Sequence, residues 1–241
     1  MRDVSVAVPS SVAVGREVRR TPDLEEMDWR GTDRMCAIGA WSARTMLGLV
    51  AAYVVVFVVG FTSLGNLSKP LPDPYLAIAE VLILVMAPIM VALMLAIHAR
   101  APVRAKPFTQ VALGWMLAAA AFTTTVHFVE LTVARHINHA TFPGYERIFD
   151  FKWPSLLYAI DIAAWDIFFG LALLFAVPAF ARRSKARAGL IASGSLCLIG
   201  LVGPFTNALG WRAIGIFGYT IVFALTCIPL SRTFVSARRI D

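Results

Sequence analysis

Six long apolar runs, separated by short polar segments, constrain the fold of this chain more than any other feature. Each run supplies about 20 residues, the length that an α-helix needs to cross roughly 30 Å of hydrocarbon. Alternating strand patterns are absent, and an open strand could not satisfy its backbone in lipid. We place the runs at residues 45–64, 76–98, 111–134, 156–180, 190–206 and 213–230. The sequence therefore predicts an all-α integral membrane protein with six transmembrane helices.

Lys and Arg are distributed unevenly between the two sets of loops. Of the 22 basic residues, five fall in one set of loops. The other 17 fall in the segments 1–44, 99–110, 181–188 and 231–241. Because positively charged loops stay in the cytoplasm, we expect both termini to be cytoplasmic and the membrane to be a bacterial inner membrane. Topology and contact with anionic membrane lipids then explain the net charge of +7, and no nucleic-acid partner is expected.

Composition divides the chain into three parts. Residues 1–35 mix acids and arginines without an apolar run, which predicts a mostly disordered cytoplasmic extension and no secretory signal. Residues 36–232 hold the six-helix transmembrane domain, and residues 233–241 form a basic cytoplasmic tail. The fifth run contains Gly194 and Gly200, small residues that allow helices to pack closely in lipid.

The loop between the third and fourth runs is rich in aromatic side chains. Aromatic residues favour the headgroup region of a membrane. The loop is therefore expected either to lie on the membrane surface or to fold over the helix ends as a lid. Its aromatic residues are Phe142, Tyr145, Phe149, Phe151 and Trp153.

Five ionisable side chains gather in the outer half of the apolar runs, whereas the inner half holds only a histidine at a helix end. At about 1.5 Å rise per residue, Glu80 and Asp161 are about 7 Å from the outer ends of their helices, and Asp166 is about 15 Å deep. His127 and Glu130 lie about 5–10 Å inside the third helix at the same rise. Because a charged residue near a helix centre costs roughly 2.5–3.5 kcal/mol, all five are expected to face one another.

Helical spacing places some of these side chains on shared faces. His127 and Glu130 stand at i and i+3, and Thr123 lies one turn before His127. Asp166 is rotated by about 140° from Asp161 in an α-helix, so the two acids are not expected to reach one spot. We expect Asp166 to be protonated at neutral pH. We also expect His127 to pair with Glu130 or with a carboxyl group on a neighbouring helix.

These groups favour a lipid-phase enzyme that uses acid–base chemistry. Asp166 is the expected acid, and His127 with Glu130 is the expected base or orienting pair. Glu80 and Asp161 would modulate their charge. The substrate is expected to be a hydrophobic small molecule of isoprenoid or lipid type, because aromatic faces around the acids could shield a developing carbocation. The expected substrate-binding residues are Trp165, Phe169, Tyr158 and Thr123.

The segment 164–166, with the sequence AWD, resembles the pairing of a tryptophan with a buried acid in the small membrane-embedded terpene cyclases of meroterpenoid pathways. The resemblance covers only these few residues. In that family the acid is usually a glutamate in an early span of a seven-span protein, whereas Asp166 belongs to the fourth of six runs. The resemblance implies a cyclase or isomerase activity on an isoprenoid.

Other functions are open for the same residues. A divalent metal such as zinc could bind the set His127, Glu130, Glu80 and Asp161, as in zinc-dependent membrane hydrolases resembling ceramidases, although one histidine is a sparse ligand set. Without a metal, no cofactor is expected. A proton-coupled small transporter or a membrane sensor would use the protonation of the cluster. A structural subunit would use it only to hold helices together, and a homo-oligomer is compatible with each function.

Overall fold

The computed structural model describes residues 23–64, 71–138 and 141–238. Within these residues the chain forms helices and loops, and no strand. Six helical stretches are long and apolar enough to cross a membrane, which confirms the predicted all-α protein with six transmembrane helices. The stretches are Asp33–Ser63, Tyr75–Arg100, Val103–Ala134, Leu156–Ala179, Lys185–Thr206 and Leu209–Ala237.

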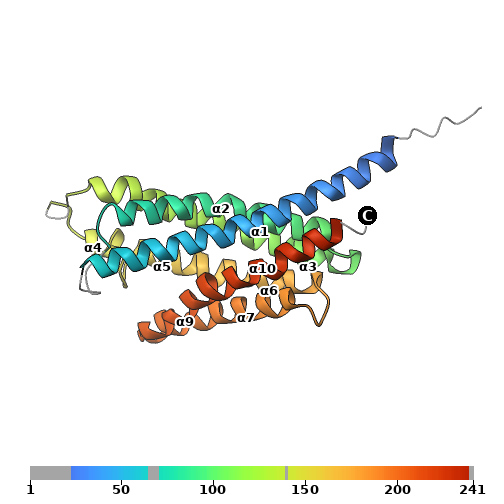
Figure 1. Ribbon diagram of the computed structural model, residues 1–241. Coiled ribbons are helices and arrows are strands. Elements are labelled where there is room, and N and C mark those ends of the chain that lie inside the picture. Colours follow the sequence, from blue (N-terminus) through green and yellow to red (C-terminus); the bar gives the residue numbers. More distant parts are fainter. Residues whose placement is uncertain (1–22, 65–70, 139–140, 239–241) are drawn as a thin grey trace, which may run out of the picture.

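Most stretches are built from several consecutive helices (Figure 1). The first stretch lies within the single helix α1 (Asp23–Leu64), and the second is the single helix α2 (Tyr75–Arg100). The third consists of η1 (Val103–Ala105), α3 (Lys106–Val129) and the π-helix η2 (Glu130–Ala134). The fourth consists of α5 (Leu156–Ile162), the π-helix η3 (Ala163–Phe169), α6 (Gly170–Ala176) and η4 (Val177–Ala179). The fifth consists of α7 (Lys185–Gly200) and α8 (Val202–Thr206). The sixth consists of η5 (Leu209–Trp211), α9 (Arg212–Phe217), the π-helix η6 (Gly218–Val222) and α10 (Phe223–Arg238). A short helix, α4 (Tyr145–Ile148), lies in the loop before α5.

The fourth stretch lies between two groups of helices. On one side α1 packs on α2, α2 packs on α3, and α3 contacts both α6 and η3. On the other side α7 contacts α6, η3, α9 and α10, and α10 packs back on α1. Figure 1 shows the start of α1 and the end of α10 at one end of the bundle, which we call the terminal end. The other end, where α4 lies, is the loop end.

Two expected domain boundaries fall inside helices. α1 already begins at Asp23, so the boundary expected between residues 35 and 36 lies within it. Residues 1–22 of the expected extension lie outside the described part of the chain. α10 continues to Arg238, so the expected basic tail is helical up to that residue, and residues 239–241 also lie outside the description.

α7 makes unusually close contacts, as its small residues predicted. A Cβ atom added at Gly194 would lie 2.8 Å from the carbonyl oxygen of Gly170, and one added at Gly200 would lie 2.8 Å from the Cα atom of Gly215. Only glycine permits such an approach of two backbones. The fifth stretch is therefore held directly against the fourth and the sixth.

The polarity of the core changes along the bundle. Fully buried apolar side chains from α2, α3, α6 and α7 fill its middle and terminal part. Toward the loop end, buried ionisable side chains come from the start of α2, the end of α3, α5 and the start of α9. The candidate functional site therefore lies in the half of the bundle near the loop end.

Candidate functional site

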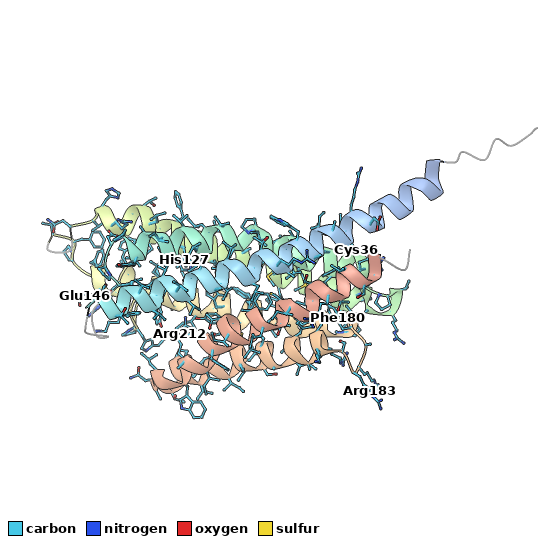
Figure 2. The ribbon with its side chains drawn as sticks, in the orientation of Figure 1. Cys36, His127, Glu146, Phe180, Arg183 and Arg212 are labelled. Carbon is cyan, nitrogen blue, oxygen red and sulfur yellow. The ribbon has the colours of Figure 1, made fainter. Side chains whose placement is uncertain are left out.

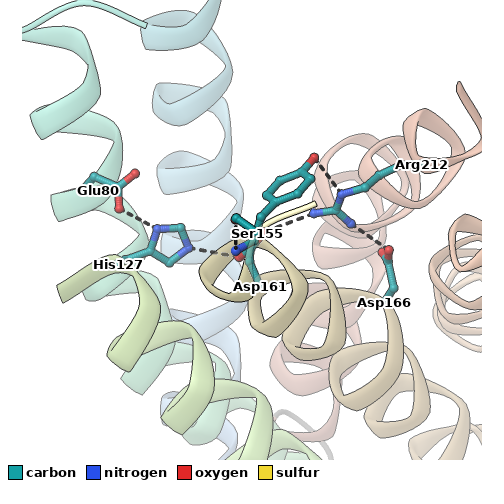
Figure 3. Close-up of polar contacts among 7 residues, drawn as sticks. Glu80, His127, Ser155, Asp161, Asp166 and Arg212 are labelled. Atoms are coloured by element: carbon teal, nitrogen blue, oxygen red, sulfur yellow. Dashed lines mark hydrogen bonds and ion pairs between the residues drawn. The ribbon is translucent and has the colours of Figure 1, made fainter. Parts of the chain in front are cut away.

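Five charged side chains form one chain of contacts across the bundle (Figure 3). The Nδ1 atom of His127 on α3 lies 2.6 Å from Oε2 of Glu80 on α2, and its Nε2 atom lies 3.4 Å from Oδ1 of Asp161 on α5. The guanidinium group of Arg212 on α9 donates from Nη2 to Oδ2 of Asp161 at 3.0 Å. It donates from Nη1 to Oδ2 of Asp166 on η3 at 2.7 Å. We call Glu80, His127, Asp161, Arg212 and Asp166 the buried charge network.

Burial is nearly complete for every member of this network. Each of the five residues has at most 4% of its surface exposed, and Asp166 is fully buried. Because the members come from the second, third, fourth and sixth transmembrane stretches, the network joins four helices through ion pairs in a low-dielectric interior. Charge in such surroundings is costly unless it is paired, which explains why the members contact one another.

The sequence indicated that Arg212 is one of the basic residues of the outer loops, and this prediction was wrong. It is the first residue of α9, only 3% of its surface is exposed, and it pairs with two acids. Its Nε atom also donates to the hydroxyl of Tyr158 at 3.0 Å, and its guanidinium lies over that ring, 4.9 Å from the centroid. A usable signal existed, because Arg212 directly precedes the sixth apolar run and the buried acids required a cation.

The expected separation of Asp161 and Asp166 was also wrong. The 140° rotation assumed a regular α-helix, but residues 163–169 form the π-helix η3. In a π-helix the backbone hydrogen bonds join residues five apart, so that residues i and i+5 lie almost on one face. Both carboxyl groups consequently reach the same guanidinium of Arg212.

Asp166 forms an ion pair with a cation that was not expected beside it. Its expected protonation rested on burial among other acids, because no positive charge was placed near it. Arg212 supplies that charge through Oδ2 of Asp166. The other carboxyl oxygen, Oδ1, is buried and has no hydrogen-bond partner in the described chain.

His127 pairs with carboxyl groups on neighbouring helices, which was one of the two expected arrangements. Its partners are Glu80 and Asp161 rather than Glu130. Glu130 begins the π-helix η2 and is 8% exposed. Its Oε2 atom is buried without a hydrogen-bond partner among the described residues. Glu130 therefore lies beside the network and is not one of its links.

The expected substrate-binding side chains are close to the network but packed. Trp165 stacks on Tyr219 with ring centroids 5.0 Å apart, and Phe169 meets Phe223 edge to face at 4.9 Å. Trp165, Phe169 and Thr123 are all buried, and Tyr158 is half-buried. These contacts make the first two side chains part of the aromatic core around Asp166.

The carboxyl group of Asp166 lies in a narrow slot between two glycines. A Cβ atom added at Gly215 would lie 2.6 Å from Oδ1 of Asp166, and one added at Gly200 would lie 3.3 Å from Oδ2. The missing side chains at these two positions therefore leave room for the carboxylate between the fifth and sixth stretches.

The donors of the network do not match a metal site. No group of three or more His, Cys, Asp and Glu side chains is arranged to hold a metal ion within the described residues. Both ring nitrogens of His127 face carboxylates, and Arg212 fills the space between Asp161 and Asp166. The carboxyl groups and the imidazole of the network are therefore engaged in ion pairs with one another and with Arg212.

The arrangement has an excess of acids over cations. Nδ1 of His127 is hydrogen-bonded to Oε2 of Glu80 at 2.6 Å, whereas its Nε2 lies 3.4 Å from Oδ1 of Asp161 without forming a hydrogen bond. Three carboxyl groups of the network face two side chains that can carry a positive charge, Arg212 and His127. Even with His127 protonated, one of the three carboxylates has no compensating charge within the network, and Glu130 is a further buried acid beside it. The network can therefore bind one more proton. Oδ1 of Asp161 and Oδ1 of Asp166 are buried and have no hydrogen-bond partner among the described residues, so either could accept it.

Comparison of the chain with protein-family models, with curated proteins and with solved structures finds no match in any of the three.

Proposed function

We propose that this protein is a proton-coupled membrane protein, a small transporter or a membrane sensor. In this proposal the buried charge network binds and releases one proton, and the change of charge moves the helices that the network joins. The observation that carries the proposal is the excess of three buried carboxyl groups over two cationic side chains.

The unpaired negative charge of the network favours the binding of a proton. An uncompensated carboxylate in a protein interior is strongly disfavoured, and a proton is the simplest ligand that removes its charge. Ionisable groups buried within membrane spans mark proton and ion pathways for the same reason. The network therefore has a physical reason to exist in two protonation states.

A change of protonation in the network would also change how its helices are held together. Breaking one side of a buried ion pair costs about 3–5 kcal/mol, which is enough to change which helix arrangement is favoured. Protonation of Asp161 or Asp166 would weaken the attachment of Arg212, and hence of α9, to the fourth stretch. We expect α9 and η3 to be the elements that respond.

Infrared difference spectroscopy tests the proposal on the full-length protein in lipid nanodiscs. Lowering the pH should produce the carbonyl band of a buried carboxylic acid, and Asp161→Asn or Asp166→Asn should remove or shift it. The control variant Asp73→Asn, which alters an exposed carboxyl at the loop end, should keep it. Hydrogen exchange in α9 should rise over the same pH range. A wild type without this band at every pH at which it is folded would refute proton binding, and a band without a change in exchange would refute coupling.

A lipid-phase enzyme with acid–base chemistry is the second candidate. The aromatic shell beside Asp166 favours it, since Trp165 stacks on Tyr219 and contacts Phe169. Because the network is buried, an isoprenoid or lipid substrate would reach it only when helices separate. Lipid extracts of membranes that contain the wild type or Asp161→Asn test this candidate: an enzyme requires a lipid that differs between them, and identical extracts would contradict it.

The proposed location is a bacterial inner membrane, with the loop end outside the cell and with membrane lipids as partners. The uneven distribution of Lys and Arg supports this orientation. The proton would then be exchanged with the outer side.

A further inference from the structure

One segment of the loop end covers the buried charge network. Residues 149–155, which we call the strap, lead from α4 into α5. The ring of Phe151 lies 5.9 Å from the imidazole of His127, between ring centroids, and 5.1 Å from the ring of Tyr158, which it meets edge to face. Phe151 therefore contacts His127 of the network directly and lies one side chain away from Arg212, because Tyr158 contacts Arg212.

Hydrogen bonds fix the strap at its two sides. Within the strap, the Ser155 hydroxyl donates to the carbonyl oxygen of Asp150 at 2.5 Å and accepts from the backbone N–H of Tyr158 at 3.2 Å, which caps α5. Across the loop end, the indole Nε1 of Trp153 donates to Oδ1 of Asn207 at 2.9 Å. Asn207 lies directly after α8, so this bond ties the strap to the fifth stretch.

The two contacts have different characters. The contact of Phe151 is apolar, and its ring lies against the imidazole of His127. The bond between Trp153 and Asn207 is a single contact between exposed or half-exposed side chains, and such a bond is worth only about 0.5–1.5 kcal/mol net. A segment held in this way can open without unfolding the bundle.

We propose that the strap is the gate of the proton route, with Phe151 as the residue that closes it and the Trp153–Asn207 bond as its latch. This inference rests on the proposed proton-coupled function. Phe151 touches the imidazole that links Glu80 to Asp161. When the strap lifts, water reaches His127 first, and a proton exchanges with the network from the loop end.

Hydroxyl-radical footprinting with peptide mass spectrometry tests the gate in the full-length protein in nanodiscs. The readout is the oxidation rate of His127, which is 2% exposed, relative to that of the exposed His136. Phe151→Ala should raise this ratio about tenfold. Trp153→Phe and Asn207→Gly should each raise it about 2- to 10-fold, the change that corresponds to one net hydrogen bond. The double variant should exceed neither single variant, because both remove the same bond.

Matched variants separate the latch from a general loosening of the loop end. Trp211→Phe changes an exposed tryptophan at the same end, and Phe205→Ala removes an exposed phenylalanine there. Both should leave the ratio unchanged. Asn207 has φ 56°, and glycine adopts this conformation without strain, so Asn207→Gly removes only the acceptor. All variants are compared at temperatures at which they melt like the wild type.

The outcomes for the gate and for the proposed function are separate. If His127 is no more accessible in Phe151→Ala and Trp153→Phe, or if Trp211→Phe has the same effect as Trp153→Phe, the gate is refuted. If accessibility rises as expected but the infrared band of a buried acid is absent from the wild type, the strap controls access to the network while the proton-coupled function fails.

Discussion

Arg212 determines the charge of the buried network, because its guanidinium is the partner of both Asp161 and Asp166. The remaining cation, His127, is shared by Asp161 and Glu80. Removing Arg212 would therefore leave three buried carboxyl groups with a single positive charge. At this scale the network behaves as a unit, and its members should not contribute independently.

Arg212→Gln should lower the free energy of unfolding by about 3–5 kcal/mol, because it leaves the buried Asp166 without a cation and leaves Asp161 with His127 alone. Adding Asp166→Asn to this variant should recover part of the loss, since one of the stranded charges disappears. Unfolding in mixed micelles at neutral pH measures both effects. Arg147→Gln, at an exposed position of the loop end, is the control and should change stability by less than about 1 kcal/mol. Equal losses in Arg212→Gln and Arg147→Gln would show that the ion pairs contribute nothing.

Tyr145 should give the stability of the loop end a pH dependence at alkaline pH. Its hydroxyl donates to the carbonyl oxygen of Ala134 at 3.3 Å. Burial and the negative charges of Glu130 and Asp150 raise the pKa of Tyr145 above its ordinary value. The neutral phenol therefore stabilises the folded state below its ordinary pKa of about 10, and this contribution is lost as the pH rises toward the raised pKa.

We expect Tyr145→Phe to be about 0.5–1.5 kcal/mol less stable than the wild type at neutral pH, the net value of one hydrogen bond. The difference should shrink as the pH rises above about 10. Equilibrium unfolding at a series of pH values measures it. A difference that stays constant up to the alkaline limit of folding would contradict the assignment.

The buried acids and His127 were singled out from sequence, whereas Arg212, the cation between Asp161 and Asp166, was not. A single acid in an apolar run of 20 residues is visible because it is exceptional there, which is why Glu80, Asp161 and Asp166 could be found. Arg212 stands at the edge of a run, where basic residues are common as topology signals. The buried acids indicated that a cation should lie among them, but a basic residue at the edge of a run can equally well point toward water.

At the scale of elements, three π-helices change the register of the transmembrane stretches in which they lie. η2 begins with Glu130, η3 contains Asp166, and η6 follows α9. The register of the fourth stretch could not be predicted, because the segment 163–169, AAWDIFF, carries no residue type that specifies a π-turn. The tertiary contacts select it: the π-turn brings both acids to Arg212.

Gly215→Ala should destabilise the protein by about 1–3 kcal/mol, the usual cost of inserting atoms into a packed interior. Its new methyl group would lie 2.6 Å from Oδ1 of Asp166 and would displace the carboxylate. Thermal unfolding in detergent measures the cost, and the infrared band of the buried acid should shift with it.

Gly114→Ala is the matched control for this substitution. It is also helical, and nothing lies within 4 Å of the added Cβ atom. This variant should be neutral or up to about 1 kcal/mol more stable, because alanine is the better helix former. If both variants behave alike, the slot around Asp166 has more room than the structure indicates.

At the scale of the whole molecule, hydropathy was sufficient to predict the fold class. Six runs of sufficient length leave the chain few alternatives in lipid, and all six stretches are present. An even number of spans also returns the chain to the side where it started, so both ends of the described chain lie at the terminal end (Figure 1). What hydropathy cannot supply is the choice between the two orientations in the membrane, which depends on charge.

The burial of Arg212 strengthens the charge asymmetry that the sequence indicates. Arg212, one of the five basic residues that the sequence assigned to the outer loops, is buried in the network. Among the described residues, the exposed basic side chains of the loop end are therefore Arg135, Arg147 and Lys152. Positive loops resist translocation, so the loop end should face the outside of the cell. Figure 2 shows Glu146 at the loop end and Arg183 at the opposite end of the bundle, and both positions are exposed.

Cysteine labelling in intact cells decides this orientation. Glu146→Cys should react with a membrane-impermeant maleimide in intact cells, and Arg183→Cys should react only after the cells are permeabilised. The three native cysteines, Cys36, Cys197 and Cys227, are buried, so the wild type should give a low background. The reverse pattern would turn the loop end, and the strap with it, toward the cytoplasm. The buried charge network would then exchange its proton with the cytoplasmic side, because its position near the loop end is fixed by the fold and not by the orientation.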